Sequence, residues 1–116
     1  MSTIDRERAA RLAHDVGKYL ARIARNVRDG EDVPDALVPL LIRDLSEAPG
    51  GGTPRARFEE LAAGLDEPRL DAVRAALARI EAGLAGERDA STLRALCADA
   101  RRVDALLREL AREASR

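Results

Sequence analysis

Apolar residues recur at helical spacing along most of the chain. Between about Thr3 and Asp29 they follow one another at intervals of three and four residues, and Gly30 is placed to end the segment. The positions are Leu12, Val16, Tyr19, Leu20, Ile23 and Val27. This spacing gathers them on one face of a long amphipathic helix. No segment alternates strictly between apolar and polar residues, so the sequence predicts no strand.

Four further helices are predicted, each marked by a turn or cap signal. A short one covers about 37–45, where Pro39 is tolerable only near the first turn. A second follows Thr53-Pro54, an N-cap with proline at the first helical position, and extends to about Leu65. A third runs from Pro68 to Gly86, and the last from about Asp89 to Ala114. The apolar stripe of this last helix keeps close to a heptad repeat.

The clearest break in the helical pattern is the stretch 48–54, which holds three glycines and two prolines. Glycines maximise backbone freedom and prolines forbid helix continuation, so we expect a mobile loop without an apolar anchor. The sequence therefore predicts an all-α fold, a small bundle of about five helices in a single domain over residues 1–116.

Composition agrees with this fold and raises the question of self-association. The 23 alanines, 19 arginines and 16 leucines make up half of the 116 residues. Alanine buries little area, so the core of one chain is modest for its length. We therefore expect a homodimer formed through an apolar helix face, that of the first helix and also that of the last.

Charge and aromatic content exclude several classes of partner. Twenty basic and 21 acidic residues leave a net charge of −1, which gives no basic field for phosphates. One Tyr, one Phe and no Trp provide no platform for stacking bases, so nucleic acid is not an expected partner. The absence of a long apolar run and of an apolar leader predicts a cytoplasmic protein that does not bind membranes. The expected partner is another protein.

Candidate chemistry centres on His14, the only histidine, which stands one helical turn before Lys18, the only lysine. On a helical wheel His14 falls opposite the apolar stripe and so points to solvent. Two alanines and Gly17 would leave room beside the imidazole, while Arg11 and Lys18 offer positive charge. Such a histidine suits a phosphoryl carrier, because its ring nitrogen must meet a phosphorus atom in line and cations must hold the phosphate oxygens.

The segment Ala13-His14-Asp15-Val16-Gly17-Lys18-Tyr19-Leu20-Ala21-Arg22-Ile23 resembles the H-box of sensor histidine kinases and histidine phosphotransferases. In that family the phosphoacceptor histidine precedes an acidic residue and then aliphatic residues at the spacing of Val16, Leu20 and Ile23. The resemblance implies that His14 is the phosphoacceptor and that Asp15 is its general base or orienting carboxylate. The sequence departs from the family pattern at Gly17 and Tyr19.

The same letters also resemble the His-Asp core of metal-dependent HD-domain phosphohydrolases, which often read His-Asp-x-Gly-Lys. Those enzymes need further histidine ligands, and the chain has no second histidine. We therefore predict no metal and no cofactor, although a degenerate remnant of such a domain stays open. Cys97 fits a small core residue, and the 50–53 stretch lacks the ending of a phosphate loop. The basic pairs Arg55/Arg57 and Arg101/Arg102 fit solvated faces.

Two hypotheses follow from the sequence. The first is a non-enzymatic, two-component-type phosphotransfer or receiver-docking protein, in which His14 carries the phosphoryl group, Asp15 assists, and Arg11, Gly17 and Lys18 contact phosphate or partner. Because 116 residues leave no room for a nucleotide-binding domain, this protein would not phosphorylate itself. The alternative is a helical interaction or scaffold protein that makes no use of His14.

Overall fold

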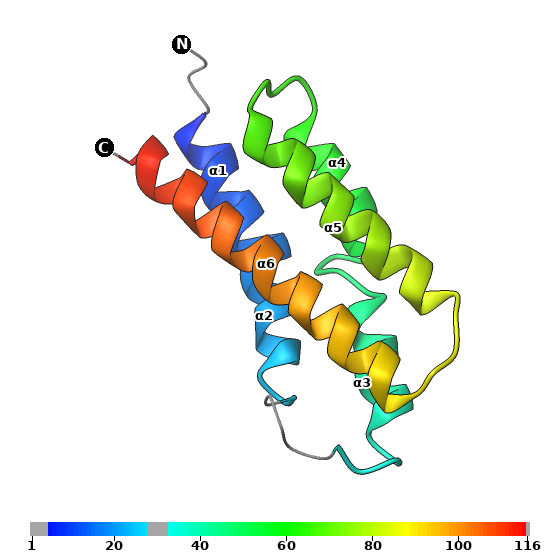
Figure 1. Cartoon of the computed structure of the whole chain (residues 1–116). Coiled ribbons are helices and arrows are strands. Elements are labelled where there is room, and N and C mark those ends of the chain that lie inside the picture. Colours follow the sequence, from blue (N-terminus) through cyan, green and yellow to red (C-terminus); the bar gives the residue numbers. More distant parts are fainter. Residues whose placement is uncertain (1–4, 28–32, 116) are drawn as a thin grey trace.

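The computed structural model describes residues 5–27 and 33–115, and all of its regular elements are helical. The first three, α1 (Arg6–Leu12), η1 (Ala13–Lys18) and α2 (Tyr19–Ala24), follow one another without a break and form one long first helix. Four more helices follow: α3 (Val38–Leu45), α4 (Pro54–Ala62), α5 (Pro68–Leu84) and α6 (Ala90–Ala114). The predicted all-α bundle of five helices is confirmed (Figure 1).

The first helix differs from the prediction in its middle and at its end. Its middle segment, η1, is a π-helix, which no feature of the sequence predicted. Regular helix ends at Ala24 rather than near Asp29, and the backbone tightens there, with the Asn26 amide donating to the Ile23 carbonyl at 3.1 Å and the Val27 amide to that of Ala24 at 3.0 Å. Asn26 Nδ2 donates to the Ile23 carbonyl at 3.1 Å, and Arg101 Nη2 donates to that of Ala24 at 3.0 Å. The expected start near Thr3 lies outside the described residues, and helix begins at Arg6.

The predicted N-cap of α4 is confirmed, and α6, which begins close to the predicted position, has an N-cap as well. Thr53 Oγ1 accepts from the Ala56 amide at 3.1 Å, with Pro54 at the first helical position. Asp89 Oδ1 accepts from the Thr92 amide at 2.8 Å. Each cap satisfies an amide that has no partner inside the helix.

Helix α4 ends at Ala62, before the expected Leu65. Gly64 has a φ of +80°, the left-handed conformation that commonly follows a helix end. Arg8 of α1 donates to the Ala63 carbonyl at 2.7 Å and so ties the end of α4 to the start of the chain. A side chain from another element therefore satisfies a carbonyl that the end of this helix exposes.

Helix α6 is the centre of the bundle. It packs lengthwise against the first helix on one side and against α5 on the other, and it also contacts α3 (Figure 1). Helix α4 packs against α5 and the first helix. The described part of the molecule measures 46 × 24 × 22 Å. The largest fully buried side chains are Leu12, Leu20, Ile42, Leu45, Phe58, Leu70, Leu77, Ile80, Leu93, Leu96, Leu107 and Leu110.

The apolar faces that we expected to mediate self-association are internal to one chain. Leu12 and Leu20 of the first helix and Leu93 and Leu107 of α6 are fully buried in the monomer core. These stripes pair with each other within the chain, so that surface is not available to a second copy. Among the described residues, only Leu37 and Leu40 are exposed large apolar side chains.

The loop at 48–54 is ordered by its own backbone. All three glycines have positive φ, between 79° and 96°, a conformation that L side chains rarely adopt. The Ala48 amide donates to the Gly52 carbonyl and the Gly51 amide to the Ala48 carbonyl, both at 3.0 Å. The expectation that nothing apolar anchors this loop is wrong, because Ala48 is buried. Its mobility stays a prediction.

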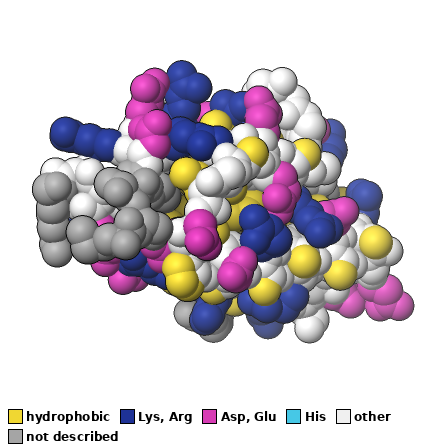
Figure 2. All heavy atoms as spheres, turned by 90° about the horizontal axis from the view of Figure 1, so that it is seen from above, with side chains coloured by type: hydrophobic (Ala, Val, Ile, Leu, Met, Phe, Trp, Pro, Cys, Tyr) yellow, Lys and Arg dark blue, Asp and Glu magenta, His cyan; other side chains and the backbone are white. Residues whose placement is uncertain are grey.

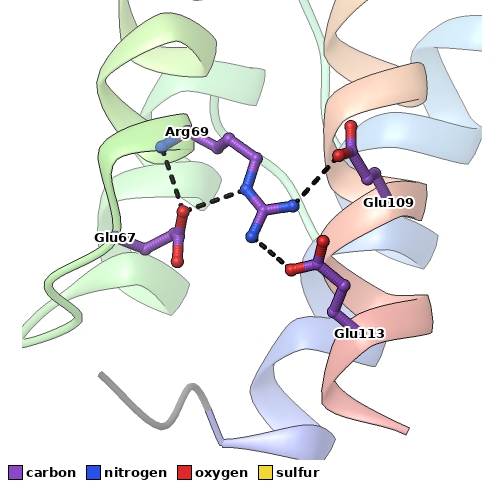
Figure 3. A network of polar contacts seen from close by, with 4 residues as sticks. All are labelled: Glu67, Arg69, Glu109 and Glu113. Carbon is purple, nitrogen blue, oxygen red and sulfur yellow. Dashed lines mark hydrogen bonds and ion pairs between the residues drawn. The ribbon is translucent and has the colours of Figure 1, made fainter. Parts of the chain in front are cut away.

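Basic and acidic side chains lie interspersed on the surface, as the face in Figure 2 shows. Many arginines bridge two helices. Arg69 at the start of α5 contacts Glu67 at 2.9 Å and Glu109 at 3.2 Å, and it also pairs with Glu113 (Figure 3). The guanidinium of Arg69 lowers the pKa of Glu67. This network, which we call the Arg69 network, joins the N-terminus of α5 to the C-terminal end of α6. None of the described helices has the length and apolarity needed to cross a membrane.

Candidate functional site

His14 lies in the π-helical segment and points to solvent, as predicted. Its side chain is 70% exposed, and its Nδ1 atom lies 2.9 Å from Oδ1 of Asp15. In a π-helix backbone hydrogen bonds span five residues instead of four, and such segments often coincide with functional sites. The segment Ala13–Lys18 contains His14, Asp15, Gly17 and Lys18, which are four of the five site residues predicted from the sequence.

Asp15 is held from both sides. Its side chain is only 19% exposed, and while Oδ1 contacts the imidazole, Oδ2 accepts from Arg57 Nη2 at 2.7 Å. Arg57 comes from α4, and its other amino nitrogen contacts Glu60 at 3.3 Å. The hydrogen bond from His14, followed by that from Arg57, lowers the pKa of Asp15. Asp15 is therefore an ionised carboxylate at neutral pH.

This arrangement fixes the reactive atom of His14. An ionised carboxylate can only accept a hydrogen bond, so the proton of the neutral imidazole resides on Nδ1. The lone pair of the neutral ring is then on Nε2, the nitrogen that has no hydrogen bond to Asp15. A neutral nitrogen with a free lone pair on an exposed side chain can act as a nucleophile or as a general base.

Two hollows flank His14, and Lys18 lines both of them. The smaller, about 250 Å³, lies toward the glycine-rich loop and is also lined by Tyr19, Arg22 and Pro49. The larger, about 470 Å³, lies between the first helix and α6. Burial raises the pKa of Tyr19, helped by the nearby carboxylates Glu47 and Asp44, so its hydroxyl keeps its proton. The smaller hollow thus offers two cations and a hydroxyl donor beside the imidazole.

Two of the predicted contact residues lie elsewhere than expected. Arg11 lines neither hollow, and its guanidinium is 3.8 Å from Glu7 one turn earlier. Gly17 is buried against α6, where an added Cβ would lie 3.1 Å from the Asp104 Cα. Because Gly17 has no side chain, the first helix and α6 can approach each other closely at this residue. Gly17 therefore provides no space beside the imidazole. We withdraw the expectation that Gly17 contacts a phosphate.

The sequence did not reveal the roles of three arginines, two of them at the site and one at the end of the first helix. Arg57 was assigned to a solvated face, yet its side chain is only 24% exposed and holds Asp15 across 42 residues of sequence. Arg22 follows His14 and Lys18 at one-turn spacing, a helical pattern that could have revealed it. Arg101 was likewise read as solvated, but it donates to the carbonyls at the end of α2.

The other sequence candidates play no part in a site. Cys97 is fully buried in α6, and burial raises the pKa of its thiol, so it is the core residue that the sequence predicted. Among the described residues, no three His, Cys, Asp or Glu side chains gather in a way that could hold a metal ion.

Comparisons with protein families, with curated proteins and with solved structures found no match for this chain.

Proposed function

We propose that this protein is a histidine phosphotransfer or receiver-docking protein of two-component type, with His14 as the phosphoacceptor. The observation that supports it is the chain of contacts from Arg57 through Asp15 to His14. In the neutral form of the imidazole this contact keeps the proton on Nδ1 and leaves the lone pair on Nε2, on a side chain that a partner can reach. An imidazole that serves only as a solvated surface group needs no such support.

The transfer step follows from this geometry. His14 Nε2 attacks the phosphorus of a partner's aspartyl phosphate, so that a P–N bond forms while the acyl P–O bond breaks and the partner's carboxylate leaves. The imidazole ring becomes cationic as the P–N bond forms, with its proton still on Nδ1. Asp15 stabilises that positive charge through its hydrogen bond, and no proton has to be removed.

Lys18 is placed to neutralise the transferred group. It stands one helical turn after His14, lines both hollows beside it, and has no ion pair among the described residues. Arg22 and the hydroxyl of Tyr19 line the smaller hollow and can hold further phosphate oxygens. Lys18 keeps the role that the sequence predicted, and Arg22 takes the place of Arg11.

The direct test is transfer from receiver domains that have been phosphorylated with a small acyl phosphate. We expect acid-labile, base-stable phosphate on the protein. His14→Gln should abolish it with the fold intact, and Asp15→Asn should slow it by at least about tenfold, as for loss of an orienting group. Arg43→Gln, an exposed cation on α3, is the matched control and should transfer normally. Transfer to His14→Gln at the normal rate would overturn the proposal.

One observation favours the alternative, a helical interaction protein without chemistry at His14. Leu37 and Leu40 are 45% and 47% exposed, and an exposed apolar pair is a common feature of protein contacts. If His14→Gln behaves as the unmodified protein in every transfer assay while Leu37 and Leu40 are needed for partner binding, this alternative holds.

A further inference from the structure

A second feature of the surface is the larger hollow, which we call the α6 groove. It lies between the first helix and α6, which run side by side in Figure 1, and it has a volume of about 470 Å³. Four alanines line it: Ala10, Ala13 and Ala21 from the first helix and Ala111 from α6. Because these side chains are short, another chain can approach both helices closely there.

The charged residues of the α6 groove are mainly basic. Lys18, Arg25 and Arg108 line it together with His14, and Asp104 is its only carboxylate. Asp104 is already paired with Arg108 at 3.1 Å, and its side chain is 13% exposed. Lys18 and Arg25 have no ion pair among the described residues. The groove therefore has uncompensated positive charge, although the chain as a whole carries −1.

Several arginines elsewhere face carboxylates of a neighbouring helix: Arg55 faces Glu81, Arg74 faces Glu59, and Arg79 faces Asp99. At the α6 groove the described residues supply only one carboxylate, that of Asp104, against three cations. Charge complementarity requires further carboxylates from a partner.

The length of the groove indicates the shape of that partner. Ala10 and Ala21 are eleven residues apart, which is about 16 Å, or three turns, along a helix. A groove lined by four alanines and three cations fits the apolar stripe of a short helix whose flanking positions are acidic. We propose that the α6 groove binds an amphipathic helix of a partner protein that carries Asp or Glu on both sides of a small apolar stripe.

A second copy of this chain would have to break its own ion pairs to present α5 or α6 as such a helix. The carboxylates on the outer faces of α5 and α6 are engaged within the chain, Asp71 with Arg74, and Glu109 and Glu113 with Arg69. A foreign helix is therefore the occupant that the charges fit. This inference goes beyond the phosphotransfer proposal, since Arg25, Ala21 and Ala111 take no part in that reaction.

The test is selection of binders from a displayed library of helical peptides with randomised surface positions, using the full chain as the target. We expect the selected peptides to have Asp or Glu at one-turn spacing beside small apolar residues. Amide shifts of the target should change at Ala10, Ala21 and Ala111. Binding should weaken steeply with salt, because the contacts are ionic and exposed.

Two variants then locate the contact. Arg25→Glu should weaken binding of the selected peptides at least about tenfold, since it replaces an attraction by a repulsion, and Ala21→Phe should do the same by filling the groove. Arg43→Glu on α3 makes the same charge change outside the groove and should bind normally. Arg25→Glu should still accept phosphate on His14 at the normal rate, because Arg25 takes no part in the transfer, and this separates the present proposal from the phosphotransfer proposal.

Four outcomes would overturn it, three of them from the library selection. The library could yield no binder, or binders without acidic enrichment, or binders whose shifts map to Leu37 and Leu40 and ignore Arg25→Glu. Competition by inorganic phosphate alone, with shifts identical to those of the peptides, would show that the groove takes a simple anion and not a helix.

Discussion

Replacing Gly17 by alanine sets two effects of similar size against each other. Alanine is a better helix former than glycine by about 1 kcal/mol, so an isolated helix would gain stability. In this fold the new Cβ would lie 3.1 Å from the Asp104 Cα, 3.4 Å from its Oδ1 and 3.5 Å from the Leu107 Cβ. The first distance is shorter than ordinary van der Waals contact, and its partner is a backbone atom in the interior of α6.

The clash can be relieved only if two helices separate by a few tenths of an ångström, because a backbone atom cannot rotate away as a side-chain end can. Overpacking of this kind costs roughly 2 kcal/mol, which exceeds the gain of about 1 kcal/mol and leaves a net loss of about 1 kcal/mol. In a domain of this size that lowers the melting temperature by about 4 °C. Gly17→Val places two methyl groups more than Gly17→Ala at the same contact and should cost more stability.

The assay is urea unfolding followed by circular dichroism, with Gly86→Ala as the control. A Cβ on Gly86 would meet only the Gly83 carbonyl oxygen, at 3.5 Å, so this variant should be neutral or slightly more stable. If Gly17→Ala is as stable as the unmodified protein, the close approach of the first helix and α6 does not exist in solution, and the reasoning fails.

Four more results are expected. Arg57→Gln should shift His14 toward a mixture of its two neutral tautomers, because the carboxylate that holds Nδ1–H loses its second partner; nitrogen chemical shifts of the ring measure this, and an unchanged tautomer would contradict it. His14→Ala should change the free energy of unfolding by no more than about 0.5 kcal/mol in a denaturant titration, as for an exposed side chain, and a loss of several kcal/mol would contradict its exposure. Because the pKa of Glu67 is lowered in the folded state, this carboxylate stabilises the fold fully above the pKa that Glu67 has in the unfolded chain, and the stabilisation is lost as the pH falls through its folded pKa. Arg69→Met should flatten this acid dependence, which is measured as the unfolding midpoint against pH. Thr53→Ala should cost about 1 kcal/mol in thermal unfolding through the lost N-cap of α4, and an unchanged midpoint would show that the cap is weak.

The sequence predicted the helices well because each carries its own signals. The cap at Thr53 and the stripe of α6 are local, and both are read within a few residues of the element they define. The exposure of His14 followed from the same periodicity. The ends of the first helix were less predictable, because a partner of its last turn is Arg101, a residue far along the chain that donates to the Ala24 carbonyl.

The support of the site could not be predicted, because it depends on the packing of α4 against the first helix. Nothing local distinguishes Arg57 from the neighbouring Arg55, yet the first holds Asp15 and the second pairs with Glu81 of α5. The sequence indicated that a glycine is needed at position 17, but the predicted reason was space beside the imidazole, whereas the structure places Gly17 against α6. The wheel assumed regular α-helix, whereas this residue lies in the π-helical segment.

Chemical labelling of the single buried thiol can report the opening of the bundle. Cys97 is the only cysteine of the chain and lies fully buried in α6, the helix that packs against the first helix, α3 and α5. A thiol reagent in solution can reach it only when α6 separates from its neighbours, and each molecule can react once. The labelling rate is measured by mass at several reagent concentrations. At high concentration it reports how often the bundle opens, and at low concentration it also depends on how long the bundle stays open.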